Sequence, residues 1–195
     1  MVKVNRRTGG FCTGVLIAPD KVLTAAHCLY LKNTDHWLGA DRIHVVQNSR
    51  RGDSAVLPYV MGPDGSIPRD GANASTHLDW AVRTLETPLG EGIEPVAPGV
   101  AWPAPGEELL QAGFSADSRH VLTLHRNCNI LEGFDGDRVL THDCDAVSGD
   151  SCSPLMVTDA DGNVRLLAIH SGPGETGGLT VGIAVAVKAM GDAVR

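Results

Sequence analysis

Short apolar runs, separated by turn-forming residues, constrain the fold of this chain most strongly. The clearest runs are Val15–Ile17, Val121–Leu124, Val164–Ile169 and Leu179–Val187. Runs of this length that are rich in valine, leucine and isoleucine, with glycine, aspartate and asparagine between them, are typical of strands. Asp161-Gly162-Asn163, which separates two such runs, indicates a hairpin. Helix is expected only as a turn after Ala25 and as a short segment over Val185–Val194. The pattern predicts an all-β fold.

A stretch rich in proline and glycine interrupts this pattern near the middle of the chain. Residues 87–106 contain five of the 11 prolines and four glycines, and they show little helical or strand periodicity. We interpret residues 91–106 as a linker between two strand-rich domains, residues 1–90 and residues 107–195. A length of 195 residues suits one such two-part unit.

The charge balance and the distribution of apolar residues exclude several classes of partner. The chain has 16 Lys+Arg against 23 Asp+Glu and a formal net charge of −7, which argues against binding to nucleic acid or to an anionic membrane. No apolar run reaches the roughly 18–20 residues of a membrane-spanning helix, and no segment of signal-peptide type opens the sequence. We therefore expect a soluble protein that binds neither nucleic acid nor membrane.

Three short segments together supply the groups of a nucleophilic catalyst. They are Leu23-Thr24-Ala25-Ala26-His27-Cys28, His77-Leu78-Asp79-Trp80-Ala81-Val82 and Ser148-Gly149-Asp150-Ser151-Cys152-Ser153-Pro154-Leu155. A serine hydroxyl needs an imidazole to take its proton, and the imidazolium needs a carboxylate on its other nitrogen. His27, Asp79 and Ser151 are the candidates for these roles. The amides of Gly149 and Ser151 are candidates for an oxyanion hole.

The order of these groups along the chain narrows the choice of family. α/β-Hydrolases run serine, aspartate, histidine and subtilisins run aspartate, histidine, serine, whereas this chain runs histidine, aspartate, serine. Over Val2–Val187 the chain resembles the chymotrypsin-like (trypsin-like) serine proteases. Its brevity and the segment Ala168-Ile169-His170-Ser171-Gly172 resemble the compact bacterial members related to glutamyl endopeptidases. The resemblance implies two antiparallel β-barrels, with His27 and Asp79 on the first, Ser151 on the second and the site between them.

The five cysteines, Cys12, Cys28, Cys128, Cys144 and Cys152, fit the same resemblance. It implies a disulfide between Cys12 and Cys28 beside the catalytic histidine, with Cys128 and Cys144 as the second pair. Two disulfides point to a secreted or periplasmic protein, while a native Met1 with reduced cysteines would point to the cytoplasm. Cys152 is then the free thiol and a candidate for redox sensitivity. No Cys-x-x-Cys or His-x-x-x-His spacing supports a metal site from His27, Cys28, His142 and Cys144, so we expect no metal and no cofactor.

The chain departs from the family pattern at two positions beside the nucleophile. Cys152 stands where the family has glycine, so a side chain is expected next to Ser151, and narrowed access or a changed backbone dihedral could slow acylation. We still assign Ser151 as the nucleophile, because viral cysteine relatives replace the serine itself. In trypsin-type members the residue before the serine pairs with a new amino terminus. Asp150 has no such partner here, so either upstream residues are missing or another donor holds it.

Two residues give conflicting indications of the side chain preferred before the cleaved bond. Asp145, six residues before Ser151, matches the carboxylate floor that selects Arg or Lys in trypsin-like members. His170 matches the histidine with which glutamyl endopeptidases bind an acidic side chain. A buried carboxylate would repel an acidic guest, so we expect a basic preference. By resemblance, Ser171 supports the triad aspartate and Gly172 pairs with the substrate backbone.

These observations predict a monomeric serine endopeptidase that acts on peptides or proteins. A glutamyl-specific endopeptidase is an alternative on the same site. A catalytically impaired member that binds peptides through the cleft is a second alternative, motivated by Cys152 and the absent amino-terminal segment. An esterase-like hydrolase is a third and is less favoured, because the Gly172 region suggests pairing with a peptide.

Overall fold

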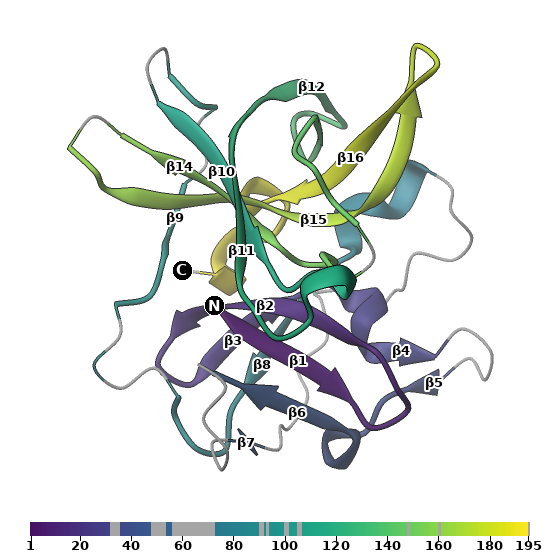
Figure 1. Cartoon of the computed structure of the whole chain (residues 1–195), viewed down its shortest axis with the longest axis vertical. Helices are drawn as coiled ribbons and strands as arrows, with labels where there is room; N and C mark the ends of the chain where they lie inside the picture. The colour runs from purple at the N-terminus through teal and green to yellow at the C-terminus, as the bar shows by residue number, and fades with distance from the viewer. Residues whose placement is uncertain are drawn as a thin grey trace.

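Two large, mainly antiparallel β-sheets, stacked one above the other, form most of the described part of the protein (Figure 1). The computed structural model describes residues 1–31, 36–47, 54–55, 73–89, 92, 94–99, 102–104, 107–147, 149–159 and 161–194. Among these residues, no helix has the length and apolar character that crossing a membrane would require. The fold confirms the prediction of an all-β, two-barrel, chymotrypsin-like architecture with short helical turns near residue 190.

The first sheet has the strand order β7-β6-β1-β2-β3-β8. Its strands are β1 (Val2–Arg6), β2 (Phe11–Ala18), β3 (Lys21–Thr24), β6 (Ile43–Val46), β7 (Ser54–Ala55) and β8 (Ala81–Thr84). A separate ribbon pairs β4 (Tyr30–Leu31) with β5 (His36–Trp37), and the 3-10 turns are η1 (Ala26–Leu29), η2 (Ala40–Arg42) and η3 (Asn73–Leu78). Strand β1 shows the alternation of a half-buried strand, since Val2 and Val4 are buried whereas Lys3 is partly exposed.

The second sheet has the strand order β11-β10-β14-β15-β16-β13-β12. Its strands are β10 (Glu108–Gly113), β11 (Thr123–Cys128), β12 (Ile130–Phe134), β13 (Val139–His142), β14 (Pro154–Thr158), β15 (Val164–Thr176) and β16 (Leu179–Ala186). The short strand β9 (Ala97–Pro98) pairs in parallel with β15. The remaining 3-10 turns are η4 (Ala116–Ser118), η5 (Val187–Ala189) and η6 (Gly191–Val194).

The sequence-based expectations for individual elements mostly hold. The hairpin at Asp161-Gly162-Asn163 joins β14 to β15, and Asp159 accepts hydrogen bonds from the turn amides of Asp161 and Asn163. The predicted strand at Val121–Leu124 begins two residues later, at Thr123. Part of the predicted linker lies outside the described residues. The domain limits at residues 90 and 107 therefore stay predictions.

One apolar cluster extends across both sheets. It includes Val4 and Val22 of the first sheet, Met156 and Ile169 of the second, and Cys152. The segment 187–194 adds Val187, Met190 and Val194 to the same cluster. The two sheets are therefore held together by a shared apolar core as well as by the chain that links them.

Both expected disulfides are present, Cys12–Cys28 in the first half and Cys128–Cys144 in the second. Each closes a loop with a sequence separation of 16. Since the loops are equally long, the chain-entropy model gives both bonds the same stabilisation, about 3 kcal/mol.

Cys152 is the free cysteine, and its thiol is fully buried. Its Sγ lies 3.7 Å from the carbonyl oxygen of Leu23, and burial raises the pKa of the thiol far above its usual value. Redox-sensitive thiols are exposed and have a lowered pKa, so the burial of Cys152 argues against the redox sensitivity considered for it. Its φ of 66° is in the left-handed region, which costs a residue other than glycine about 1–2 kcal/mol.

Removing either disulfide is expected to destabilise the protein to a similar degree. The double variants Cys12→Ala/Cys28→Ala and Cys128→Ala/Cys144→Ala should each lower the free energy of unfolding by about 3 kcal/mol in urea denaturation. A loss below about 1 kcal/mol for either pair would contradict the chain-entropy account for that loop.

The native protein is expected to hide its free thiol from reagents. Ellman's reagent should detect no thiol in the folded protein and one thiol per chain in denaturant, because only Cys152 is reduced. Labelling of the native protein at the rate of an exposed cysteine would show that the site opens readily.

Candidate active site

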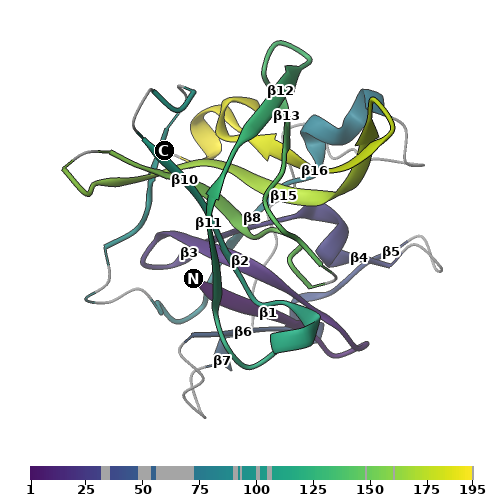
Figure 2. The ribbon, with the colours of Figure 1, turned by 45° about the horizontal axis from the view of Figure 1, so that its top comes forward.

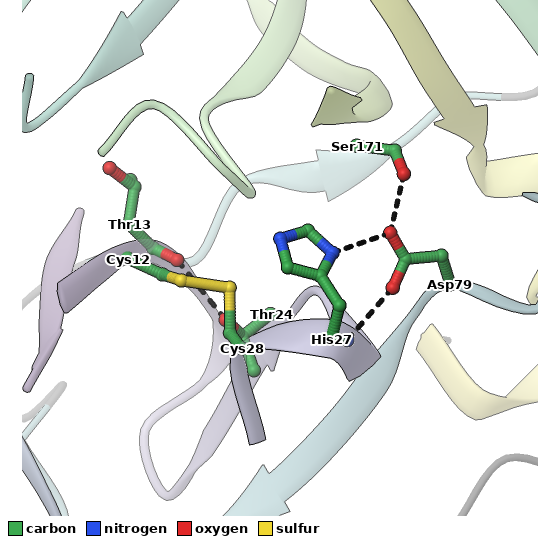
Figure 3. A network of polar contacts seen from close by, with 7 residues as sticks. All are labelled: Cys12, Thr13, Thr24, His27, Cys28, Asp79 and Ser171. Carbon is green, nitrogen blue, oxygen red and sulfur yellow. Dashed lines mark hydrogen bonds and ion pairs between the residues drawn. A yellow bond between two sulfur atoms is a disulfide. The ribbon is translucent and has the colours of Figure 1, made fainter. Parts of the chain in front are cut away.

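A carboxylate holds the proposed base through two hydrogen bonds (Figure 3). His27 lies in η1, directly after β3, and Asp79 lies between η3 and β8. The Nδ1 of His27 is 2.7 Å from Oδ2 of Asp79, and the backbone N–H of His27 donates to Oδ1 at 2.9 Å. Because Nδ1 carries the proton in this contact, Nε2 is left as the basic nitrogen. In Figure 3 that second ring nitrogen points away from Asp79.

Asp79 is buried but ionised. Burial alone would raise the pKa of its carboxyl, yet the charge of His27 and hydrogen bonds from His27 and Ser171 outweigh burial and lower that pKa. The Ser171 hydroxyl, on β15 of the second sheet, donates to Oδ2 of Asp79 (Figure 3). This contact is the support for the aspartate that was expected of Ser171.

Ser151 lies in a tight turn that is held by both sheets. Its carbonyl oxygen accepts a hydrogen bond from the backbone N–H of Thr13 on β2, at 3.0 Å. The next amide, that of Cys152, donates to the carbonyl of His170 on β15 at 2.7 Å. Among the described residues, no hydrogen bond joins the Ser151 hydroxyl to His27. In ligand-free structures such contacts are often loose.

The amides proposed for the oxyanion hole are available to a ligand. Gly149 has a φ of 99°, a conformation that glycine adopts without strain. Neither the Gly149 N–H nor the Ser151 N–H donates a hydrogen bond within the part of the chain that the structure describes. Ser148, the first residue of the motif, is outside the described residues.

Asp150 has donors of its own. Its Oδ1 accepts a hydrogen bond from the Ser115 hydroxyl at 2.8 Å, and its Oδ2 accepts one from the Val147 N–H at 2.8 Å. The carboxylate is buried. Ser115 and Val147 therefore act as donors to Asp150, and Ser115 had no sequence signal that revealed it.

A pocket of about 650 Å³ adjoins the nucleophile turn. Its lining includes Gly149 and Ser151 on one side and His170, Ser171 and Gly172 of β15 on the other. Ser151 and Ser171 line the same pocket, and Ser171 contacts Asp79, which contacts His27. Of the three sequence motifs, only the third lines the pocket, while Asp79 and His27 of the other two are linked to it through the contact of Ser171 with Asp79. Cys152 does not line it, so the expected narrowing by its side chain does not occur.

Two buried histidines, His142 and His170, line this pocket and meet edge to face. The Cys144 N–H donates to Nδ1 of His142, so the proton of this ring is on Nε2, which lies 3.0 Å from Nδ1 of His170. His170 in turn carries its proton on Nε2, which forms no hydrogen bond with another described residue. Burial lowers the pKa of His142 to about 4 and, together with the charges of His142 and His27, lowers that of His170 to about 3. Both rings are therefore neutral near pH 7.

The His142 ring packs against β16 at a position where only glycine leaves room for it. Gly182 of β16 faces the ring, and a Cβ there would lie 2.2 Å from Cε1 of His142. His142 was missed as a pocket residue in sequence analysis, since it is 28 residues from His170 and no motif contains both.

Asp145 does not have the surroundings that were expected of it. It is exposed at the edge of the pocket, and its backbone N–H donates to Nδ1 of His125 at 2.5 Å. The premise of a buried carboxylate beneath the pocket is wrong, because the residues that form the buried wall are His142 and His170.

A cluster of possible metal ligands at His27 is explained by the disulfide. Cys12, His27 and Cys28 have ligand atoms within 4.8 Å of one another, but the two sulfurs are bonded to each other. A disulfide leaves no thiolate to bind a metal.

Known proteins are similar to this chain in sequence and in fold. A curated glutamyl endopeptidase from Bacillus licheniformis is 30% identical over 84 residues, 43% of this chain and 26% of the relative, so the match spans about a quarter of that relative's length. A solved structure of a Glu endopeptidase in complex with MPD superposes with a TM-score of 0.71 at 21% identity, covering 96% of this chain and 86% of that one. The family model named Trypsin matches residues 1–194. This chain therefore belongs to the trypsin family.

Proposed function

We propose that the protein is a serine endopeptidase that cleaves peptide bonds after glutamate. The observation that carries the proposal is the buried Asp79 carboxylate, which bonds both N–H groups of His27 and leaves Nε2 as the base. Membership of the trypsin family supports a serine hydrolase acting on peptides. The two disulfides support an oxidising compartment, as expected for a secreted protein.

The proposed reaction uses the chain's own groups at every step. Nε2 of His27 takes the proton of the Ser151 hydroxyl as Oγ attacks the scissile carbonyl, and the Gly149 and Ser151 amides bind the oxyanion. The imidazolium, stabilised by Asp79, then gives its proton to the leaving amine, and the acyl group stays on Ser151. A water molecule, deprotonated by His27, attacks the ester, and His27 then returns this proton to Oγ of Ser151 as the acid is released. Asp79 remains ionised throughout, in keeping with its lowered pKa.

The histidine wall supports glutamate as the residue before the cleaved bond. The neutral His170 ring has its Nε2–H available to a ligand in the pocket, and a substrate carboxylate can accept a hydrogen bond from it. A bound carboxylate would also raise the pKa of His170 and favour a charged imidazolium, which strengthens the contact. The glutamyl endopeptidase relatives are consistent with this choice. The expected basic preference rested on a buried Asp145, and its exposure removes that support.

The acylation step is expected to require Ser151 and to tolerate loss of the Cys152 side chain. Ser151→Ala and Asp79→Asn should each lower kcat by about 10⁴-fold or more. Cys152→Gly should keep or raise activity, because its sulfur packs behind the turn and glycine accepts the left-handed backbone. Labelling by a fluorophosphonate probe should follow the same pattern.

Two outcomes would overturn this assignment. Activity that survives in Ser151→Ala but is lost in Cys152→Gly would make Cys152 the nucleophile. Absence of labelling in a folded, disulfide-intact protein would favour the alternative of a peptide-binding module.

Selectivity is expected to depend on His170 and not on Asp145. With peptides that differ only before the cleaved bond, kcat/KM should be about 10- to 100-fold higher for Glu than for Gln, the value of a hydrogen bond to a charged group. His170→Ala should remove this ratio, while the matched variant Asp145→Asn should leave it in place. A preference for Arg or Lys that is lost in Asp145→Asn would refute the glutamate proposal.

A further inference from the structure

A basic hollow adjoins the oxyanion loop, next to the histidine pocket. It has a volume of about 400 Å³ and is lined by Lys3 and Arg6 of β1, Phe11 of β2, Arg119 and Gly149 among others. Gly149 lines both this hollow and the 650 Å³ pocket. We propose that this basic hollow binds acidic side chains of the substrate on the leaving-group side of the cleaved bond.

The hollow abuts the reacting centre through Phe11. A Cβ built on Gly149 would lie 3.0 Å from the Phe11 ring and 2.9 Å from the backbone nitrogen of Ala116. The ring therefore packs directly against a proposed oxyanion-hole residue. Figure 2 shows turn η4 lying beside β1 and β2, so the hollow is formed by both halves of the protein.

Positive charge is concentrated around the Phe11 ring. The Nζ of Lys3 is 3.9 Å from the ring centroid, and Cζ of Arg119 is 5.9 Å from it. The Lys3 ammonium also donates a hydrogen bond to the Arg119 carbonyl, which joins β1 to the segment after η4. Burial and the neighbouring Arg119 charge both lower the pKa of Lys3.

These cations have no carboxylate partner among the described residues. No aspartate or glutamate lines the hollow, and none of Lys3, Arg6 and Arg119 forms an ion pair within the described part of the chain. The chain as a whole has a net charge of −7, so this site is a local reversal of the protein's charge. An anionic ligand would supply the missing partner.

The direction in which a peptide substrate binds indicates which anionic group would enter the hollow. This step rests on the proposed function. The scissile carbonyl lies at the Gly149 and Ser151 amides, and the side chain before the bond enters the histidine pocket. The residues after the bond leave past Gly149, which also lines the basic hollow. An aspartate or glutamate among the first residues after the bond would then meet Lys3 and Arg119.

Cleavage of matched peptides tests the proposal. Quenched peptides that share one sequence up to the cleaved bond should carry Asp, Ala or Lys in the two positions after it. At low salt, kcat/KM should be about five- to tenfold higher for Asp than for Ala, and lower still for Lys. Raising NaCl to about 0.5 M should reduce this ratio, because salt screens exposed charges.

Variants of Lys3 and Arg119 test whether these residues cause the preference for Asp after the cleaved bond. Lys3→Gln and Arg119→Gln should each bring the Asp-to-Ala ratio toward one. The control Lys188→Gln removes a lysine that contacts Asp137 and does not line the hollow, so the ratio should be unchanged. A ratio near one in the wild-type protein, or a preference that survives in the Lys3→Gln/Arg119→Gln double variant, would overturn the proposal.

A binding measurement separates this proposal from the proposed function. With Ser151→Ala, fluorescence anisotropy should show tighter binding of the Asp peptide than of the Ala peptide. If no peptide is cleaved by the wild type but this difference is found, the hollow stands and the endopeptidase proposal fails. Equal affinities for the two peptides would refute the hollow whether or not cleavage occurs.

Discussion

The buried carboxylate of Asp79 is the interaction on which the rest of the site depends. It accepts hydrogen bonds from the backbone and ring of His27 in the first half and from the Ser171 hydroxyl in the second. A buried carboxylate without donors would take up a proton, and the imidazole would then lose the partner that fixes its tautomer. The donors lie in both halves, so Asp79 has its full set of hydrogen bonds only when the two sheets are docked. Docking of the sheets therefore completes the support of the base.

The same dependence on both halves holds at the nucleophile turn. Thr13 of β2 holds the Ser151 carbonyl, and its hydroxyl accepts a hydrogen bond from the Phe114 N–H of the second half at 2.9 Å. Asp150 is held from within the second half by Ser115 and Val147. The turn also contains a left-handed Cys152, whose strain the surrounding contacts must outweigh. The chain thus fixes the turn by hydrogen bonds from several directions.

The features that are encoded locally could be predicted from the sequence. The valine- and leucine-rich runs gave the strands, Asp161-Gly162-Asn163 gave a hairpin, and the order of the three motifs gave the family. The features that sequence analysis missed depend on residues far apart in the chain. Nothing near Asp145 reveals that it is exposed, because the wall of the pocket is formed by His142 and His170 on different strands. The inward direction of the Cys152 sulfur is likewise set by packing against Leu23, 129 residues earlier.

The packing of residues 187–194 affects how the chain can fold while it is being synthesised. Val187, Met190 and Val194 belong to the cluster that contains the first sheet's Val4 and Val22. During synthesis the first half leaves the ribosome before residues 187–194 have been translated. Part of its apolar surface therefore stays uncovered until the second sheet is complete. The uncovered apolar surface of the nascent first half favours aggregation during this time.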